Sequence, residues 1–481
     1  MIEIILVCFT LLTLIATYIH YRRQNYLPGP WHLPIIGCLH RIDPKTPNLT
    51  FFKLAEKYGP IYRLKLGSIN TVFISDGKLL KKVLMKDATL ARPPLYVFDI
   101  IFEGKGLIYS PLDVWKDQRK FVTNFLKAVG ATKASPNKKN LENQMRQSAE
   151  EFIQYVQNQG KSVTLNPVEA VTKYVSNITS SLFLGRRDGE LSKTLINSFD
   201  KIVKQNQMVG TVNFFPFLRF IPTLRKAVQS IKDAMNEIHT ILNQIVCENL
   251  ETPFNVMSLA GAFMVERSKC RSDQVYNIDQ LQHLLYDIFG AATETSVTSI
   301  MWVLLYLAHF KQVQNKVRKE LWDVLQERDP RVDDLARLPY TEATLAEVAR
   351  IRTVVPVGVP HHTSEDVRVE NVTIPKNTVI MSLPWAIHMD PKVWKDPEEF
   401  CPGRFLNDEG KFCQSESFVP FQAGKRMCVG KDLANMMTFL FVSTVLQKFK
   451  LEGCNSGSVD LSYVFGFTTT PKPQDLLFIE L

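Results

Sequence analysis

A cysteine near the carboxyl end of the chain carries the strongest chemical signal. Cys428 lies in Phe421-Gln-Ala-Gly424-Lys-Arg426-Met-Cys428-Val-Gly430, directly before a long apolar helical pattern. Free backbone N–H groups at a helix start and the positive end of the helix dipole favour a thiolate over a thiol. A thiolate is a soft, strongly donating ligand that suits iron. A buried structural cysteine is the alternative, and Cys428 alone does not decide between them.

Two polar residues interrupt an otherwise apolar helical stretch. Glu294 and Thr295 stand in Gly290-Ala-Ala-Thr-Glu294-Thr295-Ser296. Polar groups in such a helix cost free energy unless they are hydrogen-bonded. The pair therefore either serves proton transfer, or the threonine hydroxyl simply bonds back to the preceding helical turn.

Two further pairs have helical spacing. Glu347 and Arg350 are three residues apart and can form an ion pair on one helix face; a weak surface pair is the alternative. Trp115 and Arg119 are four apart, so an indole N–H and a guanidinium could converge on a carboxylate. A half-buried tryptophan beside a solvated arginine is the alternative there.

The elements that must position these residues are mostly helical, with a small β portion, in one domain. Apolar residues three and four apart predict helices over 140–250, 278–325, 340–351 and 429–449. Alternating or β-branched stretches predict strands over 61–67, 70–75, 367–372 and 379–384. Strands and helices do not alternate, and no GxGxxG follows a strand, which argues against a dinucleotide-binding fold.

Composition excludes several classes of protein. The chain has 481 residues, of which 45% are hydrophobic and 22% charged, so it can bury a large core and is not a disordered protein. The net charge of +9 suits an anionic membrane surface or an acidic protein partner. No nucleic-acid module accompanies it, so no nucleic-acid partner is expected. The eight cysteines show no CxxC or zinc spacing, which favours free thiols in a reducing compartment.

The amino terminus predicts membrane attachment. The apolar run Ile4–Ile19 is followed by Arg22 and Arg23, so residues 1–23 are expected to form an uncleaved anchor with the rest of the chain in the cytosol. A cleaved signal peptide is the rival interpretation. Residues 24–40 contain several prolines and predict a stiff, extended linker. The apolar, proline-interrupted segment 206–222 predicts a membrane-dipping or lid-like connection, with a plain core segment as the alternative.

Together these motifs resemble the cytochrome P450 family, over nearly the whole chain. Phe421, Gly424, Arg426, Cys428 and Gly430 match the family's Phe-x-x-Gly-x-Arg-x-Cys-x-Gly loop at every fixed position. The resemblance implies a cytochrome P450-like single domain over residues 41–481, mainly α with a small β portion, that holds haem b. It also implies that Cys428 is the axial ligand of the haem iron, and that Arg426 pairs with a haem propionate in a loop that begins at Phe421.

The resemblance assigns the other motifs as well. Glu347 and Arg350 look like the family's Glu-x-x-Arg pair, which would be locked to Arg404 as a scaffold; Gly403 replaces the family's common glutamate before that arginine. The remaining propionate contacts would be Arg92, Trp115, Arg119 and His361, although the adjacent His362 leaves open which histidine points inward. Glu294 and Thr295 would deliver protons during oxygen activation, and Ala292 replaces a usual glycine beside them.

The resemblance also implies a reaction and its partners. It predicts an endoplasmic-reticulum monooxygenase that uses O₂ and receives electrons from NADPH–cytochrome P450 reductase, which carries the NADPH and flavin sites that this chain lacks. We expect the reductase to dock near Lys120, Lys425 and Lys431. The predicted substrate-facing segments are mostly apolar and aromatic, which implies a lipophilic substrate; they are 94–108, 206–220, 286–295, 353–359 and 463–467.

Two phrases narrow the predicted substrate. Residues 354–361 (VVPVGVPH) and 385–391 (WAIHMDP) resemble the arthropod ecdysteroid branch, most closely the side-chain 25-hydroxylase. An inactivating 26-hydroxylase or a general xenobiotic monooxygenase is the alternative. A peroxide isomerase that needs neither Thr295 nor a reductase, and a non-enzymatic steroid-binding protein, are the competitors from other classes.

Overall fold

The computed structural model describes most of the chain. It covers residues 9, 10, 13, 27–132, 135, 137–187, 189–251, 257–269, 275–454 and 458–481. The predicted anchor, 1–23, lies outside the described residues except for three positions. The first residues of the predicted linker, 24–26, lie outside them too.

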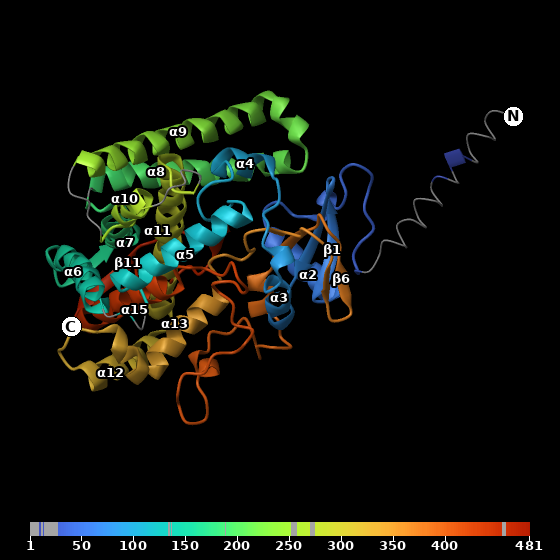
Figure 1. Ribbon diagram of the computed structural model, residues 1–481. Helices are drawn as coiled ribbons and strands as arrows, with labels where there is room; N and C mark the ends of the chain where they lie inside the picture. Colours follow the sequence, from blue (N-terminus) through green and yellow to red (C-terminus); the bar gives the residue numbers. More distant parts are fainter. Residues whose placement is uncertain are drawn as a thin grey trace.

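Helices make up most of the described chain (Figure 1). The α-helices are α2 Pro47–Tyr58, α3 Gly77–Leu84, α4 Tyr96–Phe102, α5 Leu112–Val129, α6 Lys138–Gln157, α7 Val168–Thr179, α8 Gly189–Val209, α9 Pro222–Glu251, α10 Leu259–Lys269, α11 Ile278–His309, α12 Lys311–Leu325, α13 Pro339–Ile351, α14 Pro384–His388 and α15 Lys431–Lys448. Short 3₁₀ or π turns are η1 Leu39–Arg41, η2 Asp87–Thr89, η3 Ser180–Leu184, η4 Gly210–Asn213, η5 Pro216–Phe220, η6 Val332–Arg337 and η7 Pro402–Phe405.

Four small sheets complete the described part of the fold. The strands are β1 Ile61–Leu66, β2 Ile69–Ile74, β3 Ser162–Leu165, β4 His361–His362, β5 Val367–Val369, β6 Val372–Ile374, β7 Val379–Ser382, β8 Phe449–Gly453, β9 Tyr463–Phe465, β10 Thr469–Pro471 and β11 Leu476–Glu480. The sheet orders are β1-β2-β7-β4, β3-β11-β8, β9-β10 and β5-β6. The sheet that contains β1 lies at one end of the molecule, away from α6 and α12 (Figure 1).

The long helix α11 passes through the helical core. It is the one helix among the described residues that is long and apolar enough to cross a membrane, but 61% of its apolar window is buried inside the protein. It packs against α7, α15 and α9, and Trp302 and Tyr306 on it are fully buried. Burial of this kind identifies α11 as a core helix, and it gives the motif at residues 290–296 a rigid support.

Most predicted elements are confirmed, and the exceptions have physical reasons. The predicted helical stretch 140–250 is wrong at β3, because Ser162–Leu165 pairs antiparallel with β11 from the far end of the chain. The predicted helix 278–325 breaks at Phe310, whose backbone leaves helical geometry (φ −94°, ψ 72°) between α11 and α12. The predicted strand 367–372 is a hairpin, β5–β6.

The linker is folded and not simply extended. From Leu33 the chain turns back, with reciprocal backbone hydrogen bonds of 3.0 Å between Leu33 and Gly37. Gly37 has φ +61°, and a Cβ atom there would lie 2.1 Å from the Lys65 carbonyl oxygen. A glycine is therefore required where the linker pairs with Leu66 at the end of β1. This contact ties the linker to the sheet.

Candidate functional site

The loop before α15 holds Cys428 in a fixed position. The Cys428 N–H donates to the Phe421 carbonyl at 3.0 Å, which closes the loop. Gly424 has φ +79°, and a Cβ atom on it would lie 2.4 Å from the carbonyl oxygen of Leu84 at the end of α3. Only glycine satisfies both conditions. The loop therefore packs directly against α3, and the fixed glycine of the sequence motif has a local steric reason.

The Cys428 thiol is exposed but lies among many protein atoms. The Gly430 and Lys431 N–H groups at the start of α15 bond to its sulfur and, with Arg119 nearby, lower its pKa, but burial raises it more, and the net pKa is raised. The donors at the helix start favour the thiolate as expected, but burial outweighs them. A metal ion held by this sulfur would supply a positive charge that favours the thiolate.

Arg426 points from the same loop toward α5. Its guanidinium lies 4.6 Å from the ring centroid of Trp115 and donates to the carbonyls of Ile108 at 3.2 Å and Ser110 at 3.1 Å. Its Nε is buried and has no hydrogen-bond partner in the part of the chain that the structure describes. The cation over the buried Trp115 indole is therefore Arg426 from the loop, and not Arg119 from the same helix.

The segments that carry Arg92 and His361 are joined by an isolated bridge between Ala91 and His362. Arg92 donates to the Ile108 carbonyl at 2.8 Å and to the Pro360 carbonyl at 2.7 Å. His361 is 4% exposed, and its Nδ1 donates to the Thr89 carbonyl at 2.8 Å. His362 is only partly buried. Of the two adjacent histidines, His361 is therefore the one that points inward.

Arg92, Arg119 and Arg426 form a cluster of positive charge, which Asp287 offsets only in part through its electrostatic effect on Arg92. Within the described chain, none of the three forms an ion pair with a carboxylate. Burial lowers the Arg92 pKa to about 10. Burial and the repulsion of Arg92 and Arg119 lower the Arg426 pKa to about 8. Buried charges are normally paired, so this cluster fits a ligand that brings carboxylates. The two propionates of haem are such groups, and the accessible Cys428 sulfur suits its iron.

The middle of α11 presents an accessible face. Ala291 is exposed, and Ala292, Glu294 and Thr295 are only partly buried, although most of α11 is buried. The Thr295 hydroxyl donates to the Ala291 carbonyl at 2.7 Å, so the local back-bonding interpretation is confirmed as geometry. While the hydroxyl donates this bond, its oxygen can still accept a hydrogen bond from another group. The bond to the preceding turn and a role in proton transfer are therefore compatible.

Glu294 is held by a residue from the end of the chain. Its carboxylate accepts a 2.7 Å hydrogen bond from the Thr468 hydroxyl. Burial raises the Glu294 pKa, the Thr468 hydrogen bond lowers it, and the negative charge of Asp200 raises it further. The net shift is upward, which favours a protonated carboxyl at higher pH than usual. An acid in this state can serve as a proton donor.

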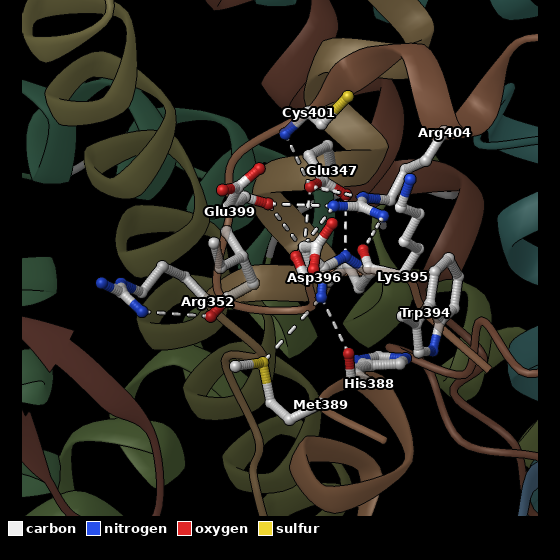
Figure 2. Close-up of polar contacts among 12 residues, drawn as sticks. Glu347, Arg352, His388, Met389, Trp394, Lys395, Asp396, Glu399, Cys401 and Arg404 are labelled. Atoms are coloured by element: carbon white, nitrogen blue, oxygen red, sulfur yellow. Dashed lines mark hydrogen bonds and ion pairs between the residues drawn. The ribbon is translucent and has the colours of Figure 1, made fainter. Parts of the chain in front are cut away.

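The Glu347 carboxylate is the centre of a buried ionic network (Figure 2). It accepts two hydrogen bonds from Arg350, at 2.7 and 2.8 Å, one from Arg404 at 2.9 Å and one from the Cys401 N–H at 2.9 Å. Glu347 and Arg350 are completely buried. The predicted arrangement of Glu347 with Arg350 and Arg404 is confirmed, and Gly403 does not disturb it. The alternative, a weak ion pair on the surface, is wrong because both Glu347 and Arg350 are buried.

Asp287 is a buried acid that sequence reasoning missed. On α11, two turns before Glu294, its carboxylate accepts hydrogen bonds from the N–H groups of Leu107 at 2.6 Å and Ile108 at 2.7 Å. Burial raises its pKa to about 7. An acid in an apolar helix was the available signal. Asp287 fixes the loop whose carbonyls bind Arg92 and Arg426, so it supports the cation cluster.

Aromatic rings line the region between α4, α8 and α11. Phe98, Phe102 and Tyr109 stack on one another with centroids 5.0 to 6.0 Å apart. Phe199 stacks on Tyr286 at 4.8 Å, and a Cβ atom on Gly290 would lie 2.5 Å from the Phe199 ring. These packed rings place an apolar surface next to the partly exposed face of α11.

Comparisons with known proteins agree with this arrangement. A family model described as Cytochrome P450 matches residues 27–478. Cytochrome P450 306a1 of Drosophila melanogaster is 31% identical, over 98% of this chain and 92% of its own length. Cytochrome P450 2J3 of Rattus norvegicus is 30% identical, over 99% and 95%. Cytochrome P450 18a1 of Drosophila melanogaster is 29% identical, over 93% and 86%.

Proposed function

The chain belongs to the cytochrome P450 family, and on that premise we propose that Cys428 is the ligand of the haem iron and that the substrate is a steroid. The family consists of monooxygenases that use haem b with a cysteine thiolate and electrons from a reductase. Bound haem would supply O₂ activation. The protein's own residues bind and orient the cofactor and substrate, move protons and exclude water.

One observation supports this assignment above the others: the unpaired guanidinium cluster lies beside the loop of an accessible cysteine. Arg426 and Cys428 are two residues apart in that loop, and Arg119 lies close enough to lower the pKa of both. Arg92 and His361 add the other side of the cluster. A single ligand that carries both a metal ion and carboxylates would satisfy the sulfur and the cations together.

The ligand assignment is tested by the difference spectrum of the reduced protein with carbon monoxide. The wild-type protein should show the Soret maximum typical of thiolate ligation, and Cys428→Ala should lose it. Cys413→Ala, at an exposed cysteine outside the loop, should keep it. A thiolate spectrum in Cys428→Ala would overturn the assignment.

Thr295 and Glu294 are proposed to move protons during turnover. Glu294 has a raised pKa and a fixed orientation, and Thr295 lies next to it on the accessible face of α11. Thr295→Ala should still be reduced but should release peroxide in place of product. A peroxide isomerase would need neither this pair nor a reductase. Product formation without a reductase would therefore favour the isomerase, and normal coupling in Thr295→Ala would contradict the relay.

The proposed reaction is side-chain 25-hydroxylation of an ecdysteroid precursor. The stacked rings at 98, 102 and 109 and the valines of 354–359 supply apolar surface, and the phrases at 354–361 and 385–391 are similar to the ecdysteroid branch. Reconstituted enzyme should be given a panel of labelled sterols and ecdysteroid precursors, and the products identified. Oxidation at carbon 26 or of unrelated lipophilic compounds would favour the inactivating or xenobiotic alternative; binding without oxidation would favour the steroid-binding protein.

The reductase is proposed to dock on the side of the molecule that carries Lys120, Lys425 and Lys431. Lys425 pairs with Asp87 at 2.5 Å, and Lys120 is exposed. An acidic flavoprotein would be steered there by charge. Lys431→Glu should raise the reductase concentration needed for half-maximal turnover, and the matched Lys226→Glu on α9 should not. Equal reductase dependence in the two variants would contradict this docking face.

The protein is proposed to lie on the endoplasmic-reticulum membrane with an apolar surface formed by Trp31, Ile35, Phe217 and Phe220. These side chains are 58%, 78%, 62% and 71% exposed. The segment that carries Trp31 and Ile35 and the segment that carries Phe217 and Phe220 both pack at the β1–β2 turn. Gly37 forms a β-bridge with Leu66, and Gly67 lies against Phe214 and Phe215. In vesicles of brominated lipid, Trp31 fluorescence should be quenched. Trp31→Phe should remove the quenched component, and Trp322→Phe, at an exposed site on α12, should retain it; the reverse would overturn the proposal.

A further inference from the structure

A cluster of two histidines and an aspartate lies outside the haem site. We propose that His239, Asp279 and His283 bind a divalent transition-metal ion such as Zn²⁺, which joins α9 to the start of α11. One ligand atom from each residue can be chosen so that all three lie within 4.8 Å of one another. Asp279 and His283 are four residues apart on α11 and share a face, while His239 comes from the neighbouring α9. The site thus bridges two helices.

The two histidine rings present free nitrogen atoms. His283 Nδ1 donates to the Asp279 carbonyl at 3.0 Å, so a neutral His283 carries its lone pair on Nε2. Among the described residues, neither His283 Nε2 nor His239 Nε2 has a hydrogen-bond partner, and both atoms are buried. The His283 side chain is 1% exposed. An unsatisfied buried polar group costs about 1–3 kcal/mol. A metal ion would satisfy both nitrogens at once, and the backbone bond would orient His283 in the way that zinc ligands usually require.

Burial also keeps these histidines in the metal-binding form. It lowers the pKa of His239 and His283, and Lys105 and the mutual repulsion of the rings lower that of His239 further. Neutral imidazole is the form that ligates metals. The rings lie 4.6 Å apart at an interplanar angle of 83°. They would need to move by about 1 Å for ligand atoms at zinc distances of about 2.0–2.1 Å from one ion.

Asp279 supplies the charge and the route of entry. Its side chain is 51% exposed, and one carboxylate oxygen, Oδ2, pairs with Lys105 Nζ at 2.5 Å. The other, Oδ1, lies 3.5 Å from His283 Nδ1, on the side of the histidine. Glu103 also pairs with Lys105, at 2.9 Å. Two imidazoles, one carboxylate and one water make a four-coordinate set of the kind that zinc adopts in proteins. Lys105 is the competing cation.

Zinc binding should be measured on the full-length, haem-loaded protein by equilibrium dialysis, with the bound metal quantified by mass spectrometry. The wild-type protein should bind one Zn²⁺ more tightly than His239→Gln does, by at least about tenfold. His309→Gln, at an exposed histidine on the same helix α11, should bind as the wild type does. X-ray absorption at the zinc edge should show two imidazoles and no sulfur, which separates this site from the cysteines.

A second variant tests the site without damaging its ligands. Lys105→Met removes the cation that holds Asp279 and should tighten zinc binding, whereas a purely structural role for the histidines predicts no gain. The carbon-monoxide spectrum should stay unchanged in all variants, which shows that they remain folded. Zinc is quantified separately from that spectrum, so a failed zinc site and a failed haem assignment give different results. Equal zinc affinity in the wild type and His239→Gln, sulfur in the absorption spectrum, or no gain in Lys105→Met would overturn the proposal.

Discussion

The Thr468 hydroxyl donates a 2.7 Å hydrogen bond to the Glu294 carboxylate. Thr468 lies between β9 and β10, and Glu294 lies in the middle of α11, so the bond joins two segments 174 residues apart. Burial raises the pKa of Glu294, and this hydrogen bond lowers it. A residue outside the helical motif therefore lowers the pKa of Glu294.

Thr468→Val should move the pH dependence of turnover upward. Without the hydroxyl, the Glu294 pKa rises further, so the carboxyl stays protonated to higher pH. If Glu294 donates protons, activity falls as pH rises through its pKa, and in Thr468→Val this fall should begin at higher pH. The rate of product formation between about pH 5 and 9 measures the shift.

The matched control for this prediction is Thr470→Val. Thr470 lies two residues further along, in β10. Its replacement also removes a threonine hydroxyl, but not the one that bonds to Glu294. Identical pH profiles for the wild type and Thr468→Val would show that Glu294 does not cause the fall in activity at high pH. A shift in Thr470→Val as well would assign the effect to the turn and not to the hydrogen bond.

Arg426→Gln should weaken haem retention more than it weakens the haem-free fold. The substitution removes a charge from a cluster in which Arg92 and Arg119 repel Arg426, so the haem-free protein loses repulsion as well as hydrogen bonds. If Arg426 binds a haem propionate, the haem-loaded protein also loses a charge-assisted contact of about 1.5–3 kcal/mol. Haem transfer to apomyoglobin should therefore accelerate by about 10- to 100-fold, from 1.4 kcal/mol per tenfold change.

Two further variants define the charge effect at this position. Arg426→Lys keeps the positive charge and should retain haem better than Arg426→Gln. Arg225→Gln, at an exposed position in α9, should leave haem transfer unchanged. If Arg426→Gln releases haem at the wild-type rate, the guanidinium cluster is not the propionate site.

The parts of the site that were predictable from the sequence depend on short spacings. The loop from Phe421 to Gly430 has its chemistry within ten residues, and the Glu347–Arg350 pair lies on one helical face. In both, the local geometry follows from the spacing alone. The resemblance then added Arg404, whose bond to Glu347 spans 57 residues. Fixed residue types at fixed spacing are what a single sequence records best.

The parts that were missed depend on contacts between distant segments. Nothing near Asp287 in the sequence indicates that it accepts the N–H groups of Leu107 and Ile108. The strand β3 forms because β11 pairs with it, and helical spacing in its neighbours hid it. The raised Cys428 pKa follows from burial by the surrounding fold. Such features are set by tertiary packing, which local propensity does not encode.

The stability of Asp287→Asn relative to the wild type should increase as pH rises. The Asp287 pKa is about 7 in the fold and near 3.8 when unfolded. Between these values the folded protein binds more protons than the unfolded chain, so this carboxyl makes the free energy of unfolding fall as pH rises, with no further loss above about pH 7. Asparagine does not titrate, so the Tm difference between variant and wild type should shift in favour of the variant from about pH 5 to pH 8.

Asp117→Asn is the control for Asp287, because Asp117 is exposed on α5. Its Tm should follow the wild type at every pH. At low pH, Asp287→Asn should be less stable than the wild type, because the amide cannot accept both N–H groups as well as the carboxyl does. A pH-independent Tm difference would contradict the raised pKa.

Glu347→Gln should prevent stable haem incorporation, whereas Gly403→Glu should not. Glu347 neutralises two arginines, and both it and Arg350 are fully buried. Loss of its charge leaves Arg350 without compensation, a change that costs about 3–5 kcal/mol for a buried pair.

Gly403→Glu is the matched variant, and it introduces the acid that the family often carries before Arg404. Gly403 is exposed, and a Cβ atom there meets only the Cys401 sulfur, at 3.7 Å, so the larger side chain fits. Tm and the yield of the thiolate carbon-monoxide spectrum measure both variants. Normal haem yield in Glu347→Gln would show that the network does not support the Cys428 loop.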